Sequence, residues 1–345
     1  MSNFSDYCDR NFTHTIPNFT VSFGFYIGLG VLGNLVAFIL LLKQSKFHKW
    51  KVFYRLVLML VCVDLAGIVI FSCISIIESP LTKWADSDSL CKVESILISF
   101  ISLTNLFVVT FIAIERFLAL WHPYFYSSVK GHPLAMLSPV AIVIVTAVLA
   151  SLALTQSNFV KIYPCNFCFI NIYSKNYADY IFAFVYIIIG LVLVAVAIVM
   201  NILVAIALSR GQRGYSRQRE SRIYITNDKR DYCGMLFQIG AAIAEVAVCW
   251  IPIMIRMLIT MTGDETSEKD MKNNYLFFRF ASWALVVDPW IYVLLRREII
   301  MNICIFFQRQ QRPRLTSSGD AVERKSNDER KSLANDEKRA SYGTI

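Results

Sequence analysis

Seven long apolar runs dominate this sequence, and they limit what the chain can fold into. Each run reaches the roughly 20 residues that a helix needs to cross the hydrocarbon core of a bilayer. The chain is 56% hydrophobic over 345 residues, a composition typical of a membrane protein with several spans. We therefore predict an all-α fold, a seven-transmembrane helix bundle. The runs lie near residues 21–43, 52–77, 92–120, 134–155, 177–209, 232–261 and 275–296.

Basic residues concentrate in the loop after the first run and in the loop between the fifth and sixth runs. Because cytoplasmic loops carry the excess of lysine and arginine, this pattern predicts an extracellular amino terminus and a cytoplasmic tail. We expect a multi-pass protein of the plasma membrane. The net charge of +9 lies in those loops and in the tail, so it does not indicate a nucleic-acid partner. The basic residues of the two loops are Lys43, Lys46, Lys49, Lys51, Arg55, Arg210, Arg213, Arg217, Arg219, Arg222, Lys229 and Arg230.

The polar segment of residues 1–20 is expected to form a glycosylated extracellular amino terminus. Three acceptor sequons for N-glycosylation fall within it, at Asn3, Asn11 and Asn18. One sequon is weak evidence, but three in so short a segment agree with the predicted orientation. The bundle itself is expected to occupy residues 21–297.

The segment after the seventh run is expected to leave the membrane core. Residues 298–310 combine an apolar stretch with basic flanks, which predicts a short amphipathic eighth helix on the membrane surface. Cys304 within it is a candidate palmitoylation site, with an unmodified thiol as the alternative. Residues 311–345 are charged and rich in serine, so we predict a disordered cytoplasmic tail.

Four of the nine cysteines fall on the predicted outer side, where the environment is oxidising and disulfides are expected. Four cysteines allow three pairings. Joining Cys91, which opens the third run, to Cys168, which lies between the fourth and fifth, would hold that loop over the mouth of the bundle. Cys8 and Cys165 would then remain as a second pair, with a free thiol as the alternative.

Several polar side chains lie at membrane depth, where each needs a partner. Asn34, Asp64, Asn105 and Asp288 come from four different runs. A hydrogen-bonded structural core is one interpretation. The other, which we favour, is a network of water and ions that rearranges between states, with two neighbouring carboxylates sharing a proton or a sodium ion at Asp64. Glu245 is a further carboxylate at this depth, and its sequence gives it no clear role.

Arg279 is a cation near the predicted outer end of the seventh run. Burying a cation in hydrocarbon costs roughly 2.5–3.5 kcal/mol, so a partner is expected. A cation in a site that opens to the outside suggests an anionic ligand. The alternative is an ion pair with a nearby acid such as Glu268, Asp270 or Glu94. Arg256, near the outer end of the sixth run, is expected to extend its charge to the membrane surface instead.

Three motifs end or interrupt the apolar runs: Glu115–Phe117 (Glu-Arg-Phe), Cys249–Pro252 (Cys-Trp-Ile-Pro) and Asp288–Tyr292 (Asp-Pro-Trp-Ile-Tyr). Together they resemble the motifs of the rhodopsin-like (class A) G-protein-coupled receptors, over residues 21 to about 307. Phe117 departs from the family's tyrosine, and the fourth and fifth runs lack the usual tryptophan and proline. The residues that the resemblance implicates in activation and G-protein coupling are Glu115, Arg116, Trp250, Pro252, Asp288, Pro289 and Tyr292.

Within that class the chain resembles the prostanoid receptors. Asp288–Arg297 (Asp-Pro-Trp-Ile-Tyr-Val-Leu-Leu-Arg-Arg) is close to that family's Asp-Pro-Trp-Val-Tyr-Leu-Leu-Leu-Arg-Lys. Tyr163–Ile170 (Tyr-Pro-Cys-Asn-Phe-Cys-Phe-Ile) is similar to its Tyr-Pro-Gly-Thr-Trp-Cys-Phe-Ile loop, and Glu115–Tyr126 is a further likeness. The lack of a proline in the fifth run agrees with this family. The chain looks like a divergent member, nearest the prostaglandin E type.

The resemblance implies an oxygenated fatty acid as the ligand. Arg279 falls on the seventh-helix arginine that pairs with the prostanoid carboxylate. Asn166 would add a hydrogen bond from the loop, and with Phe167 it replaces the family's Thr-Trp pair. Ser79 occupies the position where several members carry a carboxylate-binding tyrosine. These four residues, Arg279, Asn166, Phe167 and Ser79, are the predicted ligand-binding set.

We therefore predict a G-protein-coupled receptor for a prostaglandin E-like prostanoid that couples to heterotrimeric G proteins, with a rise in cAMP as one outcome. Arrestin and receptor kinases are expected to act on the tail, membrane lipids surround the bundle, and no cofactor is expected. A class A receptor for another lipid acid or a peptide is the alternative, followed by a transporter, although no inverted repeat is evident. An enzyme is not expected, because all four histidines, His14, His48, His122 and His132, lie outside the apolar runs.

Overall fold

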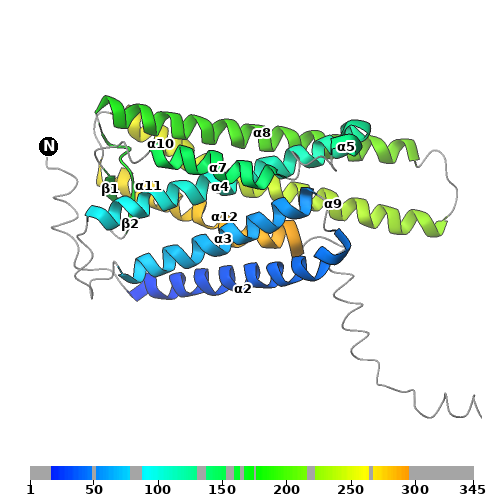
Figure 1. Ribbon diagram of the computed structural model, residues 1–345, viewed down its shortest axis with the longest axis horizontal. Helices are drawn as coiled ribbons and strands as arrows, with labels where there is room; N and C mark the ends of the chain where they lie inside the picture. Colours follow the sequence, from blue (N-terminus) through cyan, green and yellow to red (C-terminus); the bar gives the residue numbers. More distant parts are fainter. Residues whose placement is uncertain are drawn as a thin grey trace, which may run out of the picture. The chain divides into compact units, whose positions relative to one another are not determined.

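The computed structural model describes residues 17–48, 52–77, 88–129, 137–152, 159–163, 167–174, 176–215, 222–263 and 267–294. These residues form a bundle of helices with a two-stranded hairpin at one end (Figure 1). The elements are α2 (Pro17–His48), α3 (Val52–Ile77), α4 (Asp88–Trp121), α5 (Pro123–Val129), α7 (Ser138–Ser151), β1 (Phe159–Ile162), β2 (Phe167–Ile170), α8 (Tyr177–Tyr215), α9 (Arg222–Cys249), α10 (Ile251–Thr262), α11 (Glu268–Ser282), α12 (Ala284–Pro289) and the π-helical turn η2 (Trp290–Leu294).

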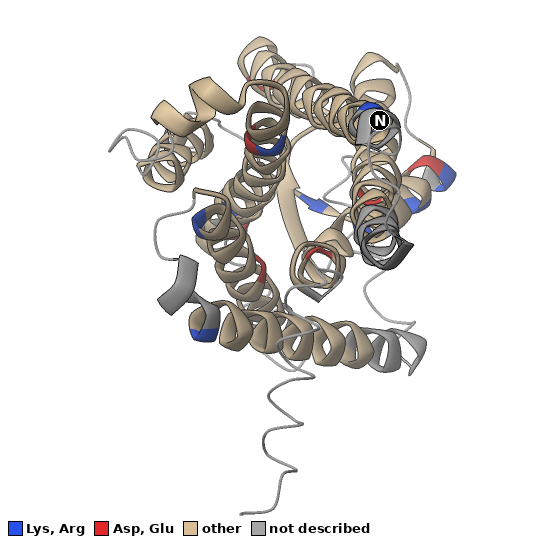
Figure 2. Ribbon diagram, turned by 90° about the vertical axis from the view of Figure 1, so that its right-hand side faces the viewer, with Lys and Arg blue, Asp and Glu red and all other residues tan. Residues whose placement is uncertain are grey.

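The predicted all-α bundle is confirmed. Six helices of the described part are long and apolar enough to cross a membrane. The predicted fourth run appears as α7, whose 14 described residues form a shorter apolar helix. Seen along the helices, few charged residues interrupt the bundle (Figure 2). The predicted features that lie outside the described residues include Asn3, Asn11, the eighth helix at 298–310 with Cys304, and the tail at 311–345.

The first helix begins earlier than predicted. α2 starts at Pro17 rather than at residue 21, so Asn18 lies in its first turn. Proline is tolerated there because the first turn of a helix does not need its N–H group. The predicted boundary followed the change from polar to apolar residues, and this change does not mark where helical backbone begins.

The third span, α4, is the element around which the bundle packs. It contacts α3, α7, α8 and both strands. Where α2, α3, α4 and α12 meet, Tyr26, Ile68, Ile101, Leu285 and Val286 form a buried hydrophobic cluster. This packing fixes the depth at which polar side chains of different helices face one another.

Prolines break the last two spans. The sixth span is divided at Trp250 into α9 and α10, with Pro252 at the second position of α10. In the seventh span Pro289 ends α12, and its missing N–H leaves the Leu285 carbonyl without its usual helical donor. The Asn34 side chain from α2 donates to that carbonyl at 3.0 Å. The break is therefore stabilised by a side chain from another helix.

A small hairpin covers the end of the bundle where α4 begins. β1 and β2 pair antiparallel, with Phe159 opposite Ile170 and Ile162 opposite Phe167. We call the hairpin and the following residues 171–174 the lid, and the end that it covers the lid end. Both strands contact α4, and Phe167 of β2 lies close to Tyr275 and Phe278 of α11; Figure 1 shows the hairpin at this end of the bundle.

Candidate functional site

An apolar cavity lies beneath the lid, with walls from α3, α4, α8, α10, α11 and α12. It encloses about 560 Å³ of space, its open mouth included. Aromatic and aliphatic side chains make up most of its lining, which suits a hydrocarbon ligand. They include Phe71, Ile98, Phe169, Trp250, Met257 and Phe278.

Few polar groups face the cavity. The hydroxyls of Ser102 on α4 and Tyr186 on α8 lie 2.8 Å apart and hydrogen-bond to each other. Ser282 on α11 is a third lining residue, and its hydroxyl donates to the Arg279 carbonyl at 2.8 Å. A long apolar ligand would therefore be oriented by a small number of hydroxyl groups within the cavity.

The lid is joined to the bundle by a disulfide. Cys91 at the start of α4 bonds to Cys168 in β2, which confirms that predicted pairing. The Cys168 N–H also donates to a Glu94 carboxylate oxygen at 2.7 Å. Two bonds thus fix the second strand over the cavity. The predicted Cys8–Cys165 pairing lies outside the described residues.

Arg279 lies in the last turn of α11, next to the cavity-lining Phe278, and it is half-buried. Its neighbour Phe278 lines the cavity, whereas Arg279 is not among the lining residues. The guanidinium carbon lies 5.9 Å from the centre of the Tyr275 ring, a distance compatible with a cation–π contact. The lid residue Phe167 contacts the same patch, with its ring centroid 6.5 Å from that of Tyr275 and 5.5 Å from that of Phe278.

Two of the four predicted ligand-binding residues, Arg279 and Phe167, thus share the Tyr275 ring as a neighbour. Asn166 and Ser79 lie outside the described residues. The Arg279 side chain hydrogen-bonds the Tyr275 side chain, and two of the acids considered as its partners make contacts of their own. Asp270 pairs with Arg256, and Glu94 accepts a hydrogen bond from the lid.

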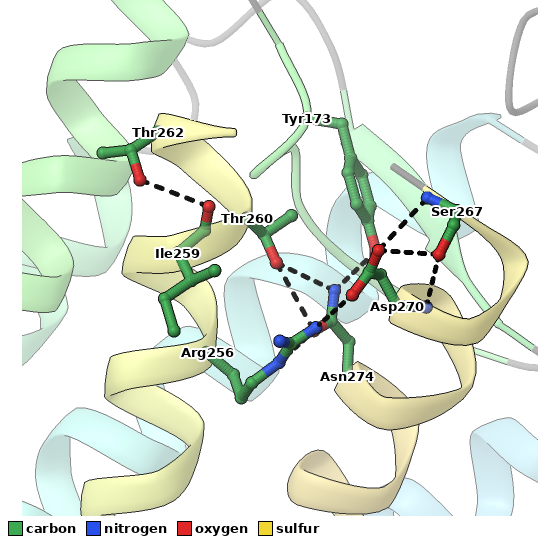
Figure 3. Close-up of polar contacts among 8 residues, drawn as sticks. All are labelled: Tyr173, Arg256, Ile259, Thr260, Thr262, Ser267, Asp270 and Asn274. Carbon is green, nitrogen blue, oxygen red and sulfur yellow. Dashed lines mark hydrogen bonds and ion pairs between the residues drawn. The ribbon is translucent and has the colours of Figure 1, made fainter. Parts of the chain in front are cut away.

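Arg256, whose charge was expected to extend to the membrane surface, has a partner on the neighbouring helix. Its side chain is only 18% exposed and forms an ion pair with Asp270 on α11 at 3.1 Å. It also donates from Nε to the Asn274 side chain at 3.2 Å (Figure 3). A guanidinium presents several donors in a fixed plane, so it can bind both partners at once. The fold places these partners one helix away, where the sequence alone does not identify them.

The buried polar network forms at the centre of the bundle. The Asn105 amide donates to Asp64 at 2.8 Å and to Asp288 at 2.7 Å, and all three side chains are fully buried. Asn34 does not bond to them directly but donates to the carbonyls of Gly30 and Leu285, each at 3.0 Å. Among the described residues, one oxygen of each aspartate has no hydrogen-bond partner. No cluster of three potential metal ligands is found in this part of the chain, and a sodium ion at Asp64 stays a prediction.

Glu245 belongs to the same region. Its side chain is 5% exposed. Asp288 and the Trp250 indole are its electrostatic neighbours. Trp250 also forms the floor of the cavity. Glu245 therefore lies between the cavity floor and the buried network, a position that its sequence context did not reveal.

The end of the bundle opposite the lid holds Glu115 and Arg116. The Tyr126 hydroxyl donates to the Glu115 carboxylate. Burial, followed by that hydrogen bond and the Glu115 charge, raises the pKa of Tyr126, so this hydroxyl stays protonated. The Arg116 guanidinium lies 4.5 Å from the centre of the Phe53 ring and 3.5 Å from the Gln238 side-chain oxygen.

Gln238 is a residue that the sequence reasoning missed. It lies in α9, is 5% exposed and donates to the Ile291 carbonyl in η2 at 2.8 Å. Its side-chain oxygen faces Arg116 of α4. One amide thus joins the third, sixth and seventh spans. A glutamine inside the apolar run 232–261 was the available signal, because a polar side chain at this depth requires a partner.

Comparisons with known proteins agree with this arrangement. The family model described as 7 transmembrane receptor (rhodopsin family) matches residues 33–292. The prostaglandin E2 receptor EP4 subtype of Mus musculus is 29% identical over 312 residues, covering 79% of this chain and 60% of that protein. The EP4 subtype of Homo sapiens is 27% identical over 309 residues, with 79% and 63% covered. The prostaglandin F2-alpha receptor of Homo sapiens is 25% identical over 289 residues, with 81% and 78% covered. The chain spans about three-fifths of the length of these EP4 relatives.

Proposed function

The chain belongs to the rhodopsin family of seven-transmembrane receptors, and we propose that it binds a prostanoid-like carboxylate and signals through a heterotrimeric G protein. The names of its relatives, which are receptors for prostaglandins, support this ligand class. The observation that carries the proposal is the apolar cavity beneath an aromatic lid, with Arg279 next to the cavity-lining Phe278.

Each part of such a ligand has a matching group in the site. The carboxylate would pair with Arg279, since charge-assisted bonds from a planar guanidinium are strong and directional. Asn166 and Ser79 would complete the head-group site, and Phe167 would cover it. The acyl chains would occupy the cavity, where burial contributes about 25 cal/mol per Å² of apolar area.

Signalling would follow from a shift between two arrangements of the sixth span. An agonist acts only through its higher affinity for one of them. Trp250 forms the cavity floor, and the break at Pro252 allows α9 to move relative to α10. Moving α9 would release Gln238 from Ile291 and expose Arg116 to a G-protein α subunit.

The remaining motif residues have supporting roles in this proposal. Glu115 would hold the resting state together with Tyr126. Asp288, Pro289 and Tyr292 would form the flexible inner end of the seventh span, and a sodium ion at Asp64 would stabilise the resting network.

The chain is a multi-pass membrane protein, and we propose that its lid end faces the outside of the cell. A disulfide is stable in an oxidising compartment, and Cys91–Cys168 lies at this end. The amino terminus would then be extracellular, with arrestin and receptor kinases acting on the cytoplasmic tail.

A panel of prostaglandins applied to cells expressing the chain tests the proposal, with G-protein nucleotide exchange, cAMP and calcium as readouts. At least one prostaglandin should stimulate exchange, and Arg279→Ala should abolish the response while surface expression is retained. Undiminished potency in Arg279→Ala would contradict the carboxylate site. Uptake of labelled prostaglandin without nucleotide exchange would contradict the receptor function and support a transporter.

A further inference from the structure

A cluster of polar side chains joins three elements at the lid end (Figure 3). We call it the clasp, and it consists of Tyr173 from the lid, Arg256 and Thr260 from α10, and Asp270 and Asn274 from α11. None of these residues lines the cavity. The ligand site proposed above does not use them, so the clasp requires a separate explanation.

Asn274 is the centre of the clasp. Its side-chain oxygen accepts from Arg256 Nε at 3.2 Å. Its amide nitrogen donates to the Tyr173 hydroxyl at 3.2 Å and to the Thr260 hydroxyl at 3.0 Å. The residue is 1% exposed. An asparagine amide offers two donors and an acceptor oxygen, and both ends are engaged here.

Asp270 secures the outer part of the clasp. It pairs with Arg256 at 3.1 Å and forms a reciprocal capping arrangement with Ser267 at the start of α11. The Ser267 hydroxyl accepts from the Asp270 N–H at 3.2 Å, and the Asp270 carboxylate accepts from the Ser267 hydroxyl at 2.7 Å. The first turn of α11 is thereby tied to α10.

The three elements that the clasp joins also form walls of the cavity. Phe169 precedes Tyr173 by four residues, and Phe278 follows Asn274 by one helical turn. Met257, the residue after Arg256, lines the cavity from α10. The clasp thus lies directly outside the cavity, on the side of the lid.

The clasp is stable only when its three elements stay together. Leaving a buried amide without hydrogen bonds costs free energy. Separating the lid or α10 from α11 therefore requires water to replace the lost partners. The disulfide holds the lid to α4 but forms no link to α10 or α11. Closure on the α10–α11 side therefore depends on non-covalent bonds that can open and reform.

We propose that Asn274 is a positioning residue that holds the lid and the outer end of α10 against α11 and thereby sets how fast the cavity opens to the outside. The effect on ligand exchange rests on the proposed function, whereas the effect on opening does not. Weakening the clasp should increase the rate of opening. The loss of two or more buried hydrogen bonds should make opening about tenfold faster, because these bonds stabilise the closed arrangement.

Cysteine labelling measures the opening without any ligand. Met257→Cys places a thiol in the cavity wall, and a membrane-impermeant methanethiosulfonate reagent is applied from outside intact cells. The same chain with Met257 gives the background from native cysteines. Asn274→Leu should label about ten times faster than the parent, and Tyr173→Phe should label several times faster.

Two matched controls are available on the same helices. Asn273→Leu changes the adjacent residue, which takes no part in the clasp. Thr260→Val removes a clasp hydroxyl, whereas Thr262→Val removes a hydroxyl that donates only to carbonyls of its own helix. Only the clasp variants should accelerate labelling at equal surface expression. If Asn274→Leu fails to reach the surface, the milder Tyr173→Phe and Thr260→Val decide the question.

The dissociation rate of tritiated prostaglandin E2 measures the effect of the clasp on ligand exchange. The clasp variants should release it faster, by a factor similar to that seen in labelling. Equal labelling rates in clasp and control variants would overturn the inference. Faster labelling with unchanged dissociation would overturn the role of Asn274 in ligand exchange. If the wild-type chain shows no saturable binding, the proposed ligand is wrong, and the labelling rates still test the clasp.

Discussion

Replacing Gln238 with leucine should raise signalling in the absence of agonist. The Gln238 amide joins α9 to the Ile291 carbonyl and faces Arg116, so it holds the sixth span against the third and seventh. Leucine fills a similar volume but has no polar group. Gln238→Leu therefore removes these bonds and should not disrupt packing.

The size of the effect follows from the two contacts. The bond to Ile291 is 2.8 Å long and buried, so its loss should cost the resting arrangement about 1–2 kcal/mol, including the carbonyl left without a donor. The contact with Arg116 is 3.5 Å long, at the limit for a hydrogen bond, and should add little. A shift of this size changes the equilibrium between the two arrangements by roughly 5–30-fold.

The assay is nucleotide exchange on a purified G protein, catalysed by the chain in lipid nanodiscs without ligand. Phe237→Leu is the matched control, because Phe237 is the adjacent residue and is 65% exposed. Basal exchange should rise severalfold in Gln238→Leu and stay at the wild-type level in Phe237→Leu. An unchanged or lower basal rate in Gln238→Leu, with the agonist response retained, would refute the reasoning.

Two further substitutions test the charged and buried groups. Glu115→Gln should raise basal exchange, because it removes the carboxylate that binds the Tyr126 hydroxyl; an unchanged baseline would argue against a resting-state role for this pair. Asn105→Leu should lower the melting temperature in detergent by about 4–8 °C, since it removes two buried hydrogen bonds to Asp64 and Asp288 worth about 1–2 kcal/mol each. A melting temperature equal to that of the wild type would show that these bonds contribute no net stability.

The spans were predictable from sequence because they depend on local composition. The lid disulfide was predictable because it depends on the oxidising compartment that the cysteines face. The length of an apolar run is enough to predict a membrane helix. Cysteines on the oxidising side of a membrane pair when the loop between them can bring them together. The buried Asn105–Asp64–Asp288 contact was also foreseeable, since polar groups at one membrane depth have few other partners.

The partners of Arg256 and Gln238 were not predictable, because they depend on how neighbouring helices are rotated about their axes. Arg256 is near the end of its span, which favoured contact with the membrane surface, yet α11 presents Asp270 and Asn274 to it. Gln238 bonds to a backbone carbonyl of the π-helical turn. Backbone carbonyls carry no residue-specific signal, so such a partner appears only in the folded bundle.

The central claim is that Arg279 binds the carboxylate of a prostanoid, and comparing a free acid with its methyl ester tests it most directly. In the wild type, prostaglandin E2 should bind at least about 30-fold more tightly than its methyl ester, because a buried charge pair that loses one partner costs about 2 kcal/mol or more. In Arg279→Gln the two ligands should bind with nearly equal affinity. Lys272→Gln, which removes an exposed cation from the same helix, should retain the wild-type preference for the acid. An undiminished preference for the acid in Arg279→Gln would contradict the account.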